Sequence, residues 1–167
     1  MDKKIKLGVI GVGNMGSSHI RNIMDGKCPE FELVAVADLN PARLEWAKNT
    51  VGEGLTCFDD AIAMLDSGLI EACMVCVPHY DHPKYAIACM KRGLHVMVEK
   101  PAGVYTKQVR EMNAEAEKHP GVVFGMMFNQ RTNCVYRKMR ELVRSGRYGQ
   151  LRRANWIITN WYRPQCY

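Results

Sequence analysis

Short apolar runs alternate with helical patterns through the first 128 residues. The runs predict six strands, which fall at about residues 5–10, 31–37, 55–58, 70–77, 95–98 and 122–128. The segments between them predict helices at about 15–24, 41–50, 82–93 and 106–119, and a short one capped by Asp59 that ends before Gly68. This alternation predicts an α/β fold: a Rossmann-type doubly wound parallel sheet with right-handed crossovers and strand order 3-2-1-4-5-6.

The pattern changes after Phe128. Residues 133–145 predict a helix, and residues 151–161 predict a longer strand rich in tryptophan. A strand this aromatic needs a sheet to join, and the chain stops at Tyr167 without supplying one. We therefore expect a nucleotide-binding domain over residues 1–128 and, over residues 129–167, the truncated start of a second α/β domain.

A glycine-rich turn follows the first apolar run, in the pattern Gly11-x-Gly13-x-x-Gly16. In a dinucleotide site, Gly11 permits the tight turn, Gly13 lets the backbone approach a pyrophosphate, and Gly16 lets the helix pack on the strand. Free N–H groups at the helix start, near Asn14 and Met15, attract phosphate oxygens. The alternative is a purely structural turn, because glycines punctuate many loops.

An acidic residue, Asp38, ends the second predicted strand, 22 positions after Gly16. Its carboxylate is placed to accept hydrogen bonds from ribose hydroxyls, and it would repel a 2′-phosphate, so NAD is favoured over NADP. Leu39 follows it at the same edge. Arg43 keeps NADP open, because a guanidinium there would neutralise a phosphate or stack on adenine. A cap for the helix that begins at Pro41 is the alternative role of Asp38.

Glu99-Lys100-Pro101 follows the fifth predicted strand, at the edge where open α/β sheets bind ligands. There the Lys100 ammonium would hydrogen-bond a substrate hydroxyl and offset the alkoxide charge as hydride leaves. A buried ammonium would also be able to move a proton. Glu99 would orient Lys100. The alternative is a solvated surface lysine.

Val77-Pro78-His79 follows the fourth predicted strand at the same edge, and His82 comes shortly after. We expect these residues to line the coenzyme site, with His82 near the nicotinamide or the substrate. His79-x-x-His82 suggests a metal site, but no third ligand is evident and Pro83 favours His82 as a helix cap. We expect no metal.

Composition bounds the remaining classes of function. No apolar run reaches the roughly 20 residues of a membrane helix, and the seven scattered cysteines fit a reducing compartment, so we expect a cytoplasmic protein without membrane contact. Cys73 and Cys76 are spaced CxxC, but on a strand they would face opposite sides. Residues 1–130 carry a net charge of −2 and residues 131–167 carry +8. A solvated or interdomain face explains that basic segment better than nucleic-acid binding.

The chain resembles the Gfo/Idh/MocA oxidoreductases, the family of glucose-fructose oxidoreductase and inositol dehydrogenase. The matching stretches are Gly8–Gly13, Val36–Asp38, Cys76–Pro78 with His82, Gly93–Pro101, and Ser145-Gly146 with Gly149–Leu151.

The resemblance implies a nicotinamide-binding Rossmann domain and a second domain whose sheet forms homo-oligomers. It also implies hydride transfer at a hydroxyl carbon of a sugar, cyclitol or related polyol. Lys100 matches the catalytic or substrate-binding lysine, and Asn129 and Arg131 match the crossing into the second domain. The family is usually twice this length, with an active-site Asp and His in the second domain, so we expect this chain alone to bind dinucleotide and turn over poorly.

Two other functions stay open from the sequence. Some relatives use NAD transiently to cleave glycosidic bonds, which would leave no net NADH. A non-catalytic dinucleotide-binding or sensor module, acting on a partner through its C-terminal arginines, is the second alternative.

Overall fold

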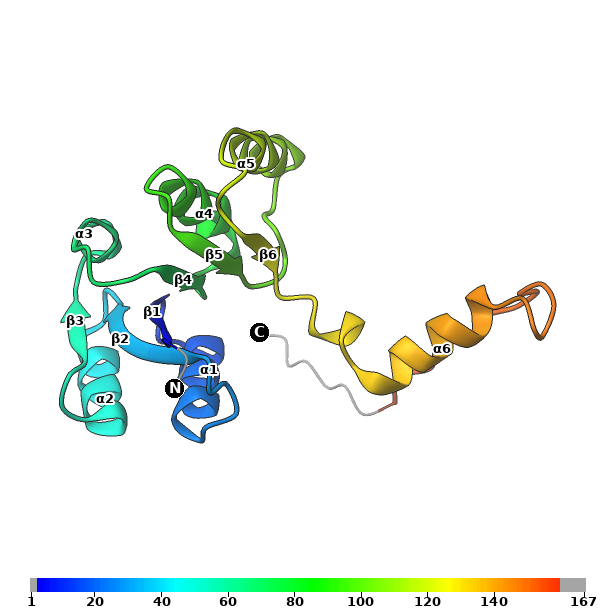
Figure 1. Ribbon diagram of the computed structural model, residues 1–167, viewed down its shortest axis with the longest axis horizontal. Coiled ribbons are helices and arrows are strands. Elements are labelled where there is room, and N and C mark those ends of the chain that lie inside the picture. The colour runs from blue at the N-terminus through cyan, green and yellow to red at the C-terminus, as the bar shows by residue number, and fades with distance from the viewer. Residues whose placement is uncertain (1–2, 160–167) are drawn as a thin grey trace. The chain divides into compact units, whose positions relative to one another are not determined.

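The computed structural model describes residues 3–159 (Figure 1). The chain divides into two compact units, of which the first ends at Met127 and the second begins at Phe128. The first unit contains the whole sheet and the glycine-rich turn, so the candidate site is built there.

A six-stranded parallel sheet forms the centre of the first unit. Its spatial order is β3-β2-β1-β4-β5-β6, which confirms the predicted order and fold class. The reversal between β1 and β4 opens a crevice at the carboxyl ends of the strands, where such sheets bind ligands. The strands are β1 (Ile5–Ile10), β2 (Phe31–Ala37), β3 (Thr56–Phe58), β4 (Ala72–Val75), β5 (His95–Val98) and β6 (Phe124–Met126).

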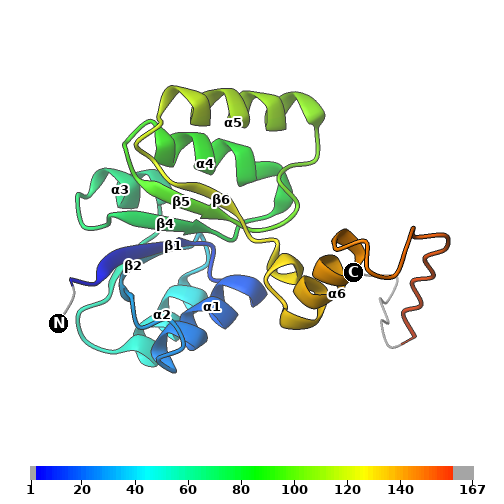
Figure 2. The ribbon, with the colours of Figure 1, turned by 45° about the vertical axis from the view of Figure 1, so that its right-hand side comes forward.

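Helices cover both sides of this sheet (Figure 2). Two lie on one side, α1 (Asn14–Met24) and α2 (Pro41–Val51), and three lie on the other, α3 (Ala61–Asp66), α4 (His82–Met90) and α5 (Thr106–Lys118). Within residues 3–159, no helix combines the length and the apolar character needed to cross a bilayer.

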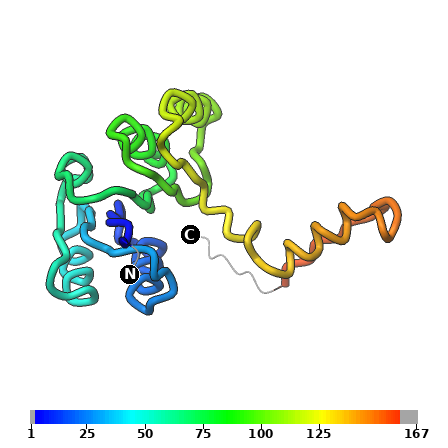
Figure 3. The backbone as a smooth tube through the Cα atoms, viewed as in Figure 1, coloured from blue at the N-terminus to red at the C-terminus, as the bar shows by residue number. Residues whose placement is uncertain are grey.

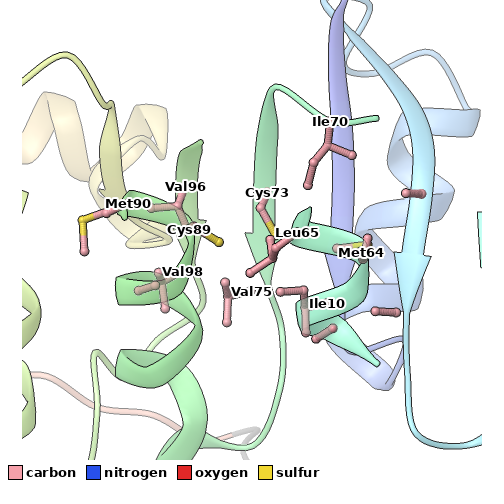
Figure 4. Close-up of a cluster of buried hydrophobic side chains, with 14 of the residues drawn as sticks. Ile10, Met64, Leu65, Ile70, Cys73, Val75, Cys89, Met90, Val96 and Val98 are labelled. Atoms are coloured by element: carbon pink, nitrogen blue, oxygen red, sulfur yellow. The ribbon is translucent and has the colours of Figure 1, made fainter. Parts of the chain in front are cut away.

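Neighbouring residues of a strand point to opposite faces of the sheet and pack into two separate cores. Ile10 points into the larger cluster, with Val75 and Val98 from β4 and β5 (Figure 4), whereas Val9 joins a second cluster with Ile20 of α1. Burial on both faces explains why the strands read as continuous apolar runs rather than alternating ones. Each fully buried Val or Ile contributes about 1.5–3 kcal/mol to folding.

Three local predictions in this unit need correction. The sixth strand is shorter than the predicted 122–128, because only Phe124–Met126 pairs with β5. The fourth strand is shorter than the predicted 70–77, since β4 ends at Val75 and the chain then turns toward Pro78, which has no N–H for a ladder. The cap of α3 is Asp60 rather than Asp59, because the N–H of Ile62 donates to the Asp60 carboxylate at 2.9 Å.

The second unit contains one long helix, α6 (Cys134–Arg144), close to the predicted 133–145 (Figure 3). Asn133 caps it by accepting the N–H of Val135 at 2.9 Å. The predicted strand at 151–161 is wrong over the described part: residues 151–159 form no regular element, and Trp161 lies outside the described residues. A strand is stable only beside a partner strand, and the described part of this unit supplies none.

Candidate functional site

The glycine-rich turn between β1 and α1 tolerates no side chain at two of its three glycines. Gly11 has a φ of +89°, and a Cβ there would lie 2.8 Å from the backbone carbonyl of Cys76. A Cβ on Gly16 would lie 1.9 Å from the carbonyl oxygen of Gly11. At Gly13 the nearest atom to such a Cβ is 3.5 Å away, on Arg43, so the protein leaves this surface open. That combination is what a turn needs if a pyrophosphate approaches its backbone.

Helix α1 begins at this turn with its backbone donors available. Gly13 is the N-cap and offers no side chain, and the first turn holds no acidic residue. The first backbone hydrogen bond runs from the N–H of Ser17 to the carbonyl of Gly13 at 2.8 Å. The N–H groups of Asn14, Met15 and Gly16 precede it, and with the helix dipole they present about half a positive charge to an anion.

A cleft of about 580 Å³ opens beside this turn, at the carboxyl ends of β1, β2 and β4. Seven of the residues expected from the sequence line it: Gly11, Gly13, Asp38, Leu39, Arg43, Val77 and Pro78. Asn14, Met15, Gly16, His79, His82, Glu99 and Lys100 lie outside its lining. Asn129 belongs to the second unit.

Asp38 is fixed at the end of β2 by backbone groups on both sides. One carboxylate oxygen accepts the N–H of Val12 at 2.7 Å and the other accepts the N–H of Asn40 at 2.8 Å. Arg43 stands 3.5 Å from it. Asp38 does not cap α2, because that role falls to Asn40, which accepts the N–H of Ala42 at 3.0 Å. The alternative role of Asp38 is therefore wrong, and Asp38 belongs to the lining of the cleft.

Sequence reasoning missed an acidic rim on the same cleft. This rim consists of Asp59 and Asp60, which line the cleft from the end of β3, and of Asp81, which lines it from the segment after β4 together with Tyr85. The signal was present, since the carboxyl ends of parallel strands meet at one edge of the sheet and each of these residues follows a strand. The rim makes the cleft unfavourable for an extra phosphate.

Glu99-Lys100-Pro101, which we call the lysine turn, follows β5. Lys100 is exposed and forms no ion pair with any described side chain, so the burial needed for proton transfer by its ammonium is missing. Glu99 is only 4% exposed. One of its oxygens accepts the backbone N–H of Lys100 at 3.1 Å, and the other lies 2.7 Å from Nε2 of His19 on α1. Glu99 thus contacts Lys100 through the backbone and not through the ammonium.

His82 joins the segments that follow β4 and β5. The residue is 1% exposed, with Nδ1 at 2.6 Å from the carbonyl oxygen of Pro101 and Nε2 at 2.8 Å from that of Val77. Carbonyl oxygens only accept, so either neutral tautomer donates to one of them. His82 is the first residue of α4, whose N-cap is Asp81. Its burial favours holding the two segments together over contact with a ligand.

Other side chains around the cleft offer little reactivity. Burial, with a smaller contribution from the charge of Glu99, raises the pKa of the Cys76 thiol to about 12. Within residues 3–159, no group of three or more His, Cys, Asp and Glu side chains is arranged to hold a metal ion. His79 is exposed, and its ring centre lies 5.7 Å from that of His82.

The sheet order and the glycine-rich turn define a dinucleotide-binding Rossmann domain. The oxidoreductase family with an NAD-binding Rossmann fold, Gfo/Idh/MocA, matches residues 5–126, and the chain belongs to this family. The cleft fits the coenzyme, because its open turn and uncapped helix start suit a pyrophosphate and the fixed carboxylate of Asp38 suits the ribose hydroxyls.

The relatives that the chain matches include named dehydrogenases. The myo-inositol 2-dehydrogenase of Thermotoga maritima is 29% identical over 146 residues, which are 87% of this chain and 42% of that protein. The structure of scyllo-inositol dehydrogenase from Lactobacillus casei with NAD(H) and scyllo-inositol matches at a TM-score of 0.82 and 30% identity, over 88% of this chain and 43% of its own.

The WlbA dehydrogenase from Bordetella pertussis, in complex with NADH and UDP-GlcNAcA, matches at a TM-score of 0.80 and 28% identity, over 88% of this chain and 44% of its own. The chain therefore spans less than half the length of each relative named here.

Proposed function

We propose that this chain is the coenzyme-binding part of an NAD-dependent dehydrogenase that acts on a hydroxyl carbon of a cyclitol, sugar or related polyol. The observation that carries the proposal is the shared edge of the sheet: the glycine-rich turn and Asp38 form one end of a crevice, and the lysine turn follows a strand two places along. The relatives that bind inositol or a nucleotide sugar support the substrate class. Cytoplasmic location and homo-oligomeric assembly stay predictions.

Different residues of the cleft bind different parts of the coenzyme. The backbone at Gly13 and the N–H groups that start α1 bind the pyrophosphate, because they form an uncapped helix N-terminus beside an open surface. Asp38 accepts hydrogen bonds from the ribose hydroxyls. Val77 and Pro78 supply the apolar wall toward the nicotinamide end.

Lys100 is the proposed catalytic residue. NAD, when bound, supplies the acceptor for the hydride of a CH–OH group. The ammonium of Lys100 donates a hydrogen bond to the hydroxyl oxygen and stabilises the alkoxide that forms when the hydroxyl proton passes to water, before the carbon gives up its hydride. Its exposure keeps it accessible to substrate, while Glu99 fixes the backbone beneath it.

The acidic rim determines the preferred coenzyme. A 2′-phosphate would meet the carboxylates of Asp38, Asp59 and Asp60, with Arg43 as the nearest cation in the lining. At about 4 Å, each like-charge pair costs about 1–4 kcal/mol, depending on how far water screens it. We therefore propose NAD as the working coenzyme, with NADP bound more weakly.

The test is NADH formation by the complete gene product with a panel of cyclitols, sugars and nucleotide sugars. Replacement of Lys100 by alanine should lower kcat by roughly 10²–10³-fold, as expected for loss of a charge-stabilising donor, while the Kd for NAD stays unchanged. Lys107→Ala, at an exposed lysine in the first turn of α5, is the matched control and should leave kcat unchanged.

Two results would contradict the proposal. Full activity of the Lys100→Ala variant would remove the catalytic assignment. Tight NAD binding without NADH formation from any substrate would instead favour one of the two alternatives: NAD-dependent cleavage of a glycosidic bond, if a glycoside is hydrolysed, or a dinucleotide-binding module, if none is.

A further inference from the structure

A buried carboxylate connects the coenzyme-binding helix to the lysine turn. Both oxygens of Glu99 are used, one by Nε2 of His19 at 2.7 Å and the other by the backbone N–H of Lys100 at 3.1 Å. The side chains of Glu99 and His19 are 5% and 16% exposed. A carboxylate this deep is stable only with partners for both oxygens, so its orientation is fixed.

His19 sits on α1, one turn beyond the part that receives the pyrophosphate. It follows Gly16 by three residues, which places both on the same face of the helix. Gly16 faces the carbonyl of Gly11 in the turn, and His19 faces the end of β5. One rigid element therefore contacts the phosphate-binding turn at its start and the lysine turn through Glu99.

We infer that His19 is a positioning residue: through Glu99 it fixes the backbone of Lys100, so that coenzyme bound at the start of α1 tightens the lysine turn. The inference rests on the proposed coenzyme site and on the proposed role of Lys100. No sequence pattern pointed to His19, because its partner lies 80 residues away in the chain.

The chemistry of the contact specifies the variants. An ionised carboxylate only accepts hydrogen bonds, so Nε2 of His19 carries the hydrogen. His19→Leu replaces the imidazole by an apolar side chain of roughly similar size and removes the donor. His19→Gln keeps an N–H donor at the end of the side chain and is the conservative replacement. Comparison of the two variants separates the effect of losing the hydrogen bond from the effect of changed packing.

The primary measurement is amide hydrogen exchange of Lys100, followed by NMR in the 167-residue chain. In the wild type this amide is held by Glu99, and addition of NAD should slow its exchange further. In His19→Leu the exchange should speed up by roughly tenfold, the effect of weakening one hydrogen bond to a charged acceptor, and NAD should no longer slow it. His19→Gln should recover most of both effects.

A merely structural role of His19 would give a different pattern. Exchange would then rise broadly over α1 and β5, and the response of Lys100 to NAD would persist. That result, or equal Lys100 exchange in the wild type and His19→Leu, would overturn the inference. If His19→Leu loses its fold, Glu99→Gln carries the test: it keeps the shape and removes the charge, Lys100 exchange should again rise about tenfold, and an unchanged rate would refute the link.

Calorimetric titration with NAD separates this inference from the proposed function. Absence of any NAD binding by the folded wild type would contradict the coenzyme site, and the coenzyme-free exchange rates would still decide the role of His19. NAD binding with no dependence of Lys100 exchange on His19 would contradict the inference alone.

Discussion

Replacement of Gly16 by alanine should damage the fold, whereas the same change at Gly13 should damage coenzyme binding alone. At Gly16 the new methyl group would lie 1.9 Å from the carbonyl oxygen of Gly11, and Cβ atoms do not approach heavy atoms closer than 3.0 Å. Helix and turn must therefore separate by about 1.1 Å. Overpacking of this kind costs about 1–3 kcal/mol, which lowers Tm by roughly 2–12 °C in a chain of this size.

Gly13→Ala places its methyl group at an ordinary contact distance of 3.5 Å, so its Tm should stay close to that of the wild type. The methyl group occupies the surface that a pyrophosphate would approach, and the Kd for NAD should rise by at least about tenfold, or 1.4 kcal/mol. Gly121→Ala, where no atom lies within 4 Å of the new Cβ, controls for the added methyl group.

Thermal unfolding by circular dichroism and NAD titration by calorimetry measure the two effects separately. A Gly13→Ala variant that binds NAD as tightly as the wild type would refute the proposed approach of the pyrophosphate. A Gly16→Ala variant as stable as Gly121→Ala would refute the packing argument.

Three further predictions concern coenzyme choice, thiol reactivity and acid stability. Asp38→Asn keeps an oxygen that accepts hydrogen bonds but loses the charge, so the ratio of the NADP Kd to the NAD Kd should fall by about tenfold or more; an unchanged ratio would show that Asp38 does not repel the 2′-phosphate. With iodoacetamide at pH 8, the exposed Cys134 should react well before Cys76, whose thiol has a pKa raised by burial to about 12; equal labelling rates in the folded chain would contradict that burial. Hydrogen bonds from Arg92 lower the pKa of Asp66 below its ordinary value of 3.8, so the stability that they contribute is present above that pH and is lost as the pH falls through the lowered value. The difference in Tm between the wild type and Arg92→Met should therefore shrink in acid. A difference that stays constant with pH would argue against the Arg92–Asp66 pair.

The fold was predictable because its signals are local and agree with one another. β1, β2 and β5 have the predicted bounds, since each is a mostly apolar run that ends where a turn or a charged residue begins. The strand order followed from topology rules that hold for doubly wound sheets. The strand prediction failed at residues 151–159, where the alternating pattern has no partner strand within the described residues.

The site was predictable only in part, because its contacts are long-range. The glycine turn and Asp38 belong to one βαβ unit, and the sequence indicated both. The partner of Glu99 is His19 rather than the neighbouring ammonium of Lys100, and spacing along the chain carries no information about a contact of that range. The sequence predicted Asp59 as the cap of α3, but the N–H of Ile62 donates to the adjacent Asp60, a difference of one residue at a helix end.

Mapping of amide NMR shifts during a titration with NAD tests the central claim most directly. The largest changes should fall in the turn at Gly11 and Gly13 and beside Asp38, which line the cleft. The coenzyme site would be contradicted if the largest shift changes fell on the apolar sheet surface around Met97 and Gly125, or if no shift changed at millimolar NAD.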